Sequence, residues 1–118
     1  MLEQDRVMRN IETLTLSLSR FVLGKEGPAW APTGEDTEWD GLALRLDAMA
    51  GRGEFGAAED LLFEAMEEGD DRALELAVSF YAHLNTLSDG QLKDGGFTRG
   101  EIEEGLREAM DRFGVVLP

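Results

Sequence analysis

Apolar residues in the N-terminal segment 2–24 recur at spacings of four, three, four and three, which is the periodicity of an amphipathic helix. This main stripe consists of Val7, Ile11, Leu14, Leu18 and Phe21. Leu16 and Leu23 fall on nearly the opposite side of the same helix. A helix that is apolar on two sides usually packs against two partners. The pattern therefore predicts a long N-terminal helix that ends at Gly24 and has more than one neighbour.

Four more segments carry a helical period, over about 38–51, 55–68, 71–87 and 98–113. The third of these is apolar around most of its circumference, so we expect it at the centre of the core. Its predicted core residues are Leu74, Ala77, Val78 and Tyr81. The Gly- and Pro-containing segment 24–37 and the polar, Gly-rich segment 88–97 are predicted to be loops, and Trp30 is expected to be pinned onto the body. No segment alternates as a strand would, which makes the chain all-α with five helices.

The hairpin over 39–68 resembles one tetratricopeptide unit, because small Ala58 and Ala65 flank bulky Leu62 where two helices would meet. The segment 72–113 could form a second, degenerate pair with a long internal loop. The predicted fold is therefore a set of tetratricopeptide-like antiparallel pairs preceded by the N-terminal helix. A compact helical bundle stays open as the alternative, since repeat arrays usually need about three or more units.

The 118 residues fit a single domain with an N-terminal helix (1–25), a loop (26–37) and a helical-hairpin body (38–118). The absence of cysteine excludes disulfides, zinc–thiolate sites and a cysteine nucleophile. The net charge of −14 repels nucleic-acid backbones. Residues 1–25 hold four basic and three acidic side chains, which gives a net charge of +1. The remaining residues hold seven basic and 22 acidic side chains, which gives a net charge of −15. The first helix is thus electrostatically distinct from the body.

Targeting and membrane signals are weak. The N-terminus lacks a basic segment followed by an apolar run and a cleavage site. No stretch reaches the ~18 consecutive apolar residues of a transmembrane helix. The first helix also carries too few basic residues for strong attraction to anionic lipid, which disfavours membrane contact. We therefore expect a cytoplasmic bacterial protein.

The residues 88–101 partly imitate a calcium-binding EF-hand loop, through Asp94, a glycine after it and a closing Glu101. The positions of the first two oxygen ligands are occupied by Gly90 and Leu92. Losing two ligands leaves too little negative charge to offset dehydration of the ion, so we predict no calcium binding. A calcium-responsive loop remains the least favoured alternative.

Acidic runs at 35–40, 67–71 and 103–104 could bind a divalent metal, and a metal-dependent enzyme that uses clustered carboxylates is the main alternative function. The one histidine, His83, cannot supply the two Glu-x-x-His patterns of di-iron bundles. It also has no carboxylate nearby in sequence to orient it as a general base. The acidic runs are therefore predicted to be solvated helix ends, and we predict no catalytic, cofactor-binding or metal-binding residue.

Several blocks together resemble the small bacterial proteins catalogued as domain of unknown function 6483. These blocks are Gln4-Asp5, Met8-Arg9, Ile11-Glu12, Leu23-Gly24-Lys25, the segments 58–64 and 74–77, Phe80-Tyr81, Leu84-Asn85, the segment 97–102, Glu104-Gly105-Leu106 and Arg112-Phe113-Gly114. The resemblance covers nearly the whole chain except the loop 26–38. It implies an architecture but no activity and no catalytic residue.

These observations favour a non-catalytic protein–protein interaction module or small scaffold whose first partner is a second copy of itself. Soluble monomers usually avoid exposing an apolar helix face such as the second face of the first helix. A two-fold dimer is the commonest way to bury such a face. The predicted interaction residues are Val7, Ile11, Leu14, Leu16, Leu18, Phe21 and Leu23. Alternatively, the loop 24–37 folds the helix back so that Trp30 and Trp39 cover its second face.

Overall fold

The computed structural model describes residues 2–32, 34–35 and 37–117, and within them it contains six α-helices, one short π-helix and no strand. The helices are α1 (Leu2–Ser17), the π-helix η1 (Leu18–Val22), α2 (Thr37–Gly51), α3 (Phe55–Ala65), α4 (Asp71–Asn85), α5 (Asp89–Asp94) and α6 (Arg99–Arg112). The all-α fold class is confirmed. The predicted number of five helices is wrong, because α5 lies inside a segment that the sequence pattern predicts to be a loop.

Helix α5 is held by its N-terminal cap rather than by an apolar face. The Ser88 hydroxyl accepts a hydrogen bond from the backbone N–H of Gln91 (3.1 Å), and the Gln91 side-chain oxygen accepts one from the N–H of Ser88 (2.9 Å). This reciprocal pair is a capping box. Leu92 is the buried side chain of α5. A single buried residue cannot produce a repeating hydrophobic pattern, so hydrophobic periodicity alone does not predict this helix.

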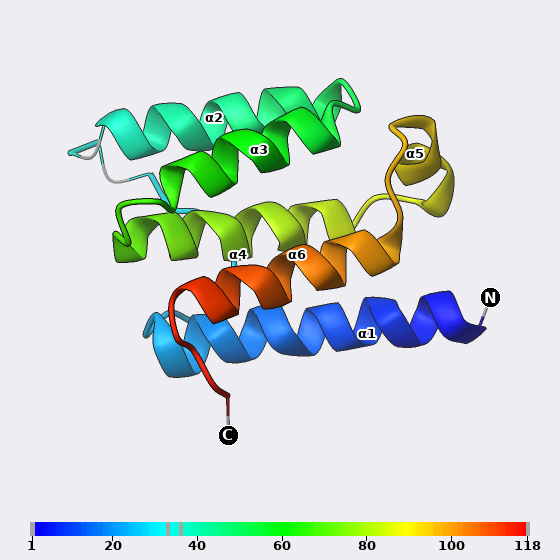
Figure 1. Cartoon of the computed structure of the whole chain (residues 1–118), viewed down its shortest axis with the longest axis horizontal. Helices are drawn as coiled ribbons and strands as arrows, with labels where there is room; N and C mark the ends of the chain where they lie inside the picture. The colour runs from blue at the N-terminus through cyan, green and yellow to red at the C-terminus, as the bar shows by residue number, and fades with distance from the viewer. Residues whose placement is uncertain (1, 33, 36, 118) are drawn as a thin grey trace.

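The long helices form two layers (Figure 1). Helices α2, α4 and α1 lie side by side, with α4 packed against both of the others. Helix α3 packs on α2 and α4, and helix α6 packs on α4 and α1. The first helix of the chain therefore lies beside the last one, at the opposite edge of the molecule from α2.

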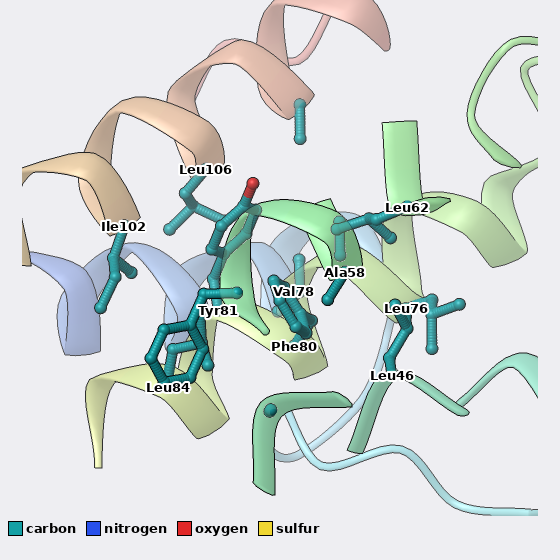
Figure 2. Close-up of a cluster of buried hydrophobic side chains, with 14 of the residues drawn as sticks. Leu46, Ala58, Leu62, Leu76, Val78, Phe80, Tyr81, Leu84, Ile102 and Leu106 are labelled. Carbon is teal, nitrogen blue, oxygen red and sulfur yellow. The ribbon is translucent and has the colours of Figure 1, made fainter. Parts of the chain in front are cut away.

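Helix α4 is the centre of the core, as its sequence predicts. Leu74, Ala77, Val78 and Tyr81 are each at most 1% exposed. Figure 2 shows side chains of α4 between Ala58 and Leu62 of α3 and Ile102 and Leu106 of α6. A helix with neighbours on several sides must be apolar around most of its circumference, because each packed side loses its contact with water.

The loop after α5 is fastened to the start of α3. Phe97 contacts Phe55 with ring centroids 5.7 Å apart, and both rings are buried. Gly95 lies so close to this pair that an added Cβ would stand 2.3 Å from the Phe55 ring. A glycine is therefore required at this close approach. The contact joins α5, far along the chain, to the first helical hairpin.

Candidate functional site

The seven apolar residues predicted to mediate self-association do not share one environment. Ile11 and Leu18 are fully buried, while Val7, Leu14 and Leu23 are partly buried and packed against the core. Helix α1 contacts both α4 and α6, which explains why its apolar stripe is covered. Most of the predicted interface is therefore part of the core of a single chain.

The π-helix η1 separates Phe21 from the stripe to which its sequence spacing assigns it. In this turn the Leu23 backbone N–H donates to the carbonyl of Leu18 at 3.0 Å, five residues back. The buried Ser19 hydroxyl donates to the carbonyl of Thr15 at 2.7 Å. The wider turn carries Leu23 to the core, whereas Phe21 is left 71% exposed. These two placements differ from the straight-helix expectation because a π-turn contains one additional residue.

Solvent reaches three large apolar side chains at the end of the first helix. Leu16 is 38% exposed, Phe21 71% and Val22 41%. Leu16 also lines an open groove of about 420 Å³ between α1 and α4, and Pro28 and Ala82 line the same groove. This end of α1 and η1 is therefore the part of the predicted interaction helix that remains available to a partner.

The linker between η1 and α2 is pinned by Trp30, as predicted. The backbone N–H of Trp30 donates to the Ser79 hydroxyl at 3.1 Å, and its indole N–H donates to Asp40 at 2.9 Å. The Arg72 guanidinium lies 4.4 Å from the centre of the indole ring, a cation–π contact. Trp30 therefore packs on α4 and α2, while Trp39 lines a groove between α2 and α3. The linker residue that lines the groove beside α1 is Pro28.

A fully buried arginine, which hydrophobic patterning cannot single out, joins three helices. Arg99 at the start of α6 is 2% exposed. Its guanidinium donates to the backbone oxygens of Asn85 and Leu87, both at 2.8 Å, and to the Asp89 carboxylate at 2.8 Å. The Asn85 amide donates in turn to the carbonyl of Met8 in α1 at 3.0 Å. Arg99 pairs backbone carbonyl groups at and just after the end of α4, which an apolar side chain could not do, so its role is structural.

A second buried polar contact lies beneath α6. The Tyr81 hydroxyl, on a side chain with no exposed surface, donates to the Glu59 carboxylate at 2.6 Å. Burial raises the pKa of Glu59, as do the nearby charges of Glu101, Asp60 and Glu108, although the Tyr81 hydrogen bond opposes the shift. Burial and the same hydrogen bond raise the pKa of Tyr81.

Gly105 allows this contact to form. A Cβ at that position would lie 2.3 Å from the Tyr81 hydroxyl and 2.6 Å from the Glu59 carboxylate. Above the contact, α3 and α6 border an open groove of about 640 Å³. The acidic residues that line this groove are Glu59, Asp60, Glu101, Glu104 and Glu108. We call it the α3–α6 groove.

The residues considered for metal chemistry are spread over the surface. In residues 2–32, 34–35 and 37–117, no group of three or more His, Asp or Glu side chains is arranged to hold a metal ion. Asp36 of the first acidic run lies outside the described residues. Helix α5 occupies the first half of the calcium-like loop, and His83 is exposed near the end of α4. No helix in the described part of the chain is long and apolar enough to cross a membrane.

Comparison with known proteins identifies the family. The model of a family of unknown function (DUF6483) matches residues 1–114, and the chain belongs to that family. The resemblance inferred from the sequence blocks is therefore confirmed. No curated protein and no solved structure matches the chain.

Proposed function

We propose that this member of the family of unknown function is a non-catalytic protein–protein interaction module that self-associates through the end of α1 and η1. The observation that carries the proposal is the exposure of Phe21. Five large apolar side chains are exposed in the described residues, and three of them lie within the range 16–22. A dimer formed through this end of the helix would remove such exposed apolar side chains from water.

The distribution of charge supports self-association at this end of the helix. Residues 1–25 carry a net charge of +1 and the remaining residues −15. Two copies that met through their acidic bodies would repel each other, whereas two near-neutral first helices would not. A two-fold arrangement would place Phe21 of each copy against the same surface of the other.

The packing of the helices also supports a tetratricopeptide-like arrangement as part of this proposal. The pairs would be α2 with α3 and α4 with α6, and α1 would lie beside the second pair. A cytoplasmic location in a bacterial cell, expected from the sequence, belongs to the same proposal. The metal-dependent enzyme and the calcium-responsive loop are not proposed, because no feature of the described residues favours them.

Sedimentation equilibrium of Phe21→Asp tests the proposed interface. Phe21 is 71% exposed, so the substitution should leave the fold intact and convert a dimer into a 13.0 kDa monomer. Leu44→Asp is the matched control, because Leu44 is 69% exposed on α2 and should not affect association. The proposal fails if the unmodified protein is monomeric at its highest soluble concentration, or if both variants weaken the dimer equally.

A further inference from the structure

A groove between α2 and α3 combines an apolar floor with an acidic rim. Its volume is about 560 Å³, and it is lined only by α2, α3 and the turn that follows α3. The floor residues are Trp39, Leu42, Leu61 and Ala65, which are all partly buried. The rim residues, all exposed, are Glu38, Arg45, Glu64, Glu67 and Glu68. We call this surface the α2–α3 groove.

The molecule repeatedly packs one helix onto the seam between two others. Helix α4 contacts both α2 and α3, and α1 contacts both α4 and α6. Helix α2 is at the edge of the molecule opposite α1 (Figure 1), and none of the residues that line the α2–α3 groove comes from a third helix. The groove is therefore a seam between two helices that is not covered by a third one, and a further helix could pack there in the same way.

The charge of the rim selects the kind of helix that fits. Four glutamates and one arginine give the rim a net charge of −3. Helix α3 ends at Ala65, so the negative end of its helix dipole lies at the same end of the groove. Lys and Arg beside an apolar stripe would place their charges on this rim while the stripe covers the floor.

We propose that the α2–α3 groove binds an amphipathic helix of another protein whose apolar stripe is flanked by Lys and Arg. A second copy does not supply this helix. Its own near-neutral helix, α1, has Ile11 and Leu18 fully buried in its own core. The rest of that copy carries a net charge of −15 and would be repelled by the rim. This proposal is independent of self-association through η1.

The probe for the test is a synthetic helical peptide of leucine and lysine with Leu at positions i, i+3, i+4 and i+7. Trp39 lies in the floor, so its fluorescence should shift when the peptide binds to the full-length protein. The shift should be absent in Trp39→Phe, which keeps Trp30. Two control peptides, one with glutamate in place of lysine and one with the leucines scrambled, should bind much more weakly.

Charge reversal then locates the peptide. Glu64→Arg with Glu68→Arg changes two rim charges of the α2–α3 groove, and it should weaken peptide binding by about tenfold or more. Asp60→Arg with Glu104→Arg is the matched control, because it makes the same change in net charge in the α3–α6 groove. Binding to this control should stay within about threefold of the unmodified protein.

Three results would overturn the proposal. Equal weakening by both pairs of substitutions would show that the basic peptide responds only to overall charge. Binding that is absent, or that is as strong for the glutamate peptide, would show that the groove does not select a basic helix. Loss of self-association in Glu64→Arg with Glu68→Arg, measured by sedimentation, would show that a second copy covers the groove.

Discussion

One added methyl group at Gly105 should destabilise the whole domain. The Cβ of Gly105→Ala would lie 2.3 Å from the Tyr81 hydroxyl, and 2.6 Å from both the Cζ of Tyr81 and the Glu59 carboxylate. Separations of less than 3.0 Å cannot be accommodated without movement. The Tyr81 ring has no exposed surface and lies among core side chains (Figure 2), so α6 must shift outward or the ring must turn.

The size of the effect follows from three contributions. Overpacking a core position costs about 1–3 kcal/mol. Weakening the hydrogen bond from Tyr81 to the half-buried Glu59 carboxylate costs about 1 kcal/mol more. Alanine regains about 1 kcal/mol over glycine in a helix interior. The last two contributions cancel, so Gly105→Ala should lower the free energy of unfolding by about 1–3 kcal/mol.

Urea denaturation followed by circular dichroism measures this change. Gly41→Ala is the matched control, because Gly41 is also inside a helix and a Cβ there would meet nothing within 4 Å. That variant should gain about 0.5–1 kcal/mol. In a Tyr81→Phe background the closest contact is removed, so the cost of Gly105→Ala should be smaller. If Gly105→Ala is as stable as the unmodified protein, α6 does not pack tightly on Tyr81 and Glu59 at this position.

Three further predictions concern the core and its polar contacts. Leu74→Ala should lower the free energy of unfolding by about 2–5 kcal/mol, measured in urea, because Leu74 is 1% exposed. Arg99→Met leaves the oxygens of Asn85 and Leu87 without their donor. Each oxygen left unpaired costs about 1–3 kcal/mol, so the loss should be about 2–6 kcal/mol, and hydrogen exchange should increase at the Asn85 contact with α1. The pKa of Glu59 is raised, so protonation stabilises the fold as the pH falls through that pKa. Measured in urea, the free energy of unfolding of Glu59→Gln should therefore exceed that of the unmodified protein at neutral pH. The difference should shrink as the pH falls towards 4.5, the ordinary pKa of a glutamate.

The large apolar features of this fold were predictable from the sequence. The all-round apolar character of α4 predicted its central place, and the bulk of Trp30 predicted that the linker would be pinned. Both predictions rest on the free energy gained when apolar side chains leave water. This gain can be expected from the local sequence, because it does not depend on which neighbour covers the side chain. The exposed end of the first helix was included in the predicted interaction residues, although most of those residues belong to the core.

Features that depend on a specific partner were not predictable in the same way. The π-turn at η1 changes which residues share a face of the helix. A prediction that assumes a constant helical period throughout cannot include this change. The burial of Arg99 depends on oxygens of Asn85 and Leu87, which reach it only after α4 and α6 have packed. The raised pKa of Glu59 likewise requires α6 to cover it. Such contacts join residues that are separate in sequence, and periodicity describes neighbours along one helix only.

The contacts of α1 with α4 and α6 constrain the order of folding during synthesis. The first helix leaves the ribosome before its partners exist, and its Asn85–Met8 contact spans 77 residues. At about 5–20 residues per second, the stripe that contains Ile11 waits roughly 5–20 s for α6 to emerge. During this interval α2, α3 and α4 can pack together, because their contacts are local. Helix α1 can pack on α4 once α4 has emerged, but the part of its apolar stripe that faces α6 stays uncovered until α6 is made.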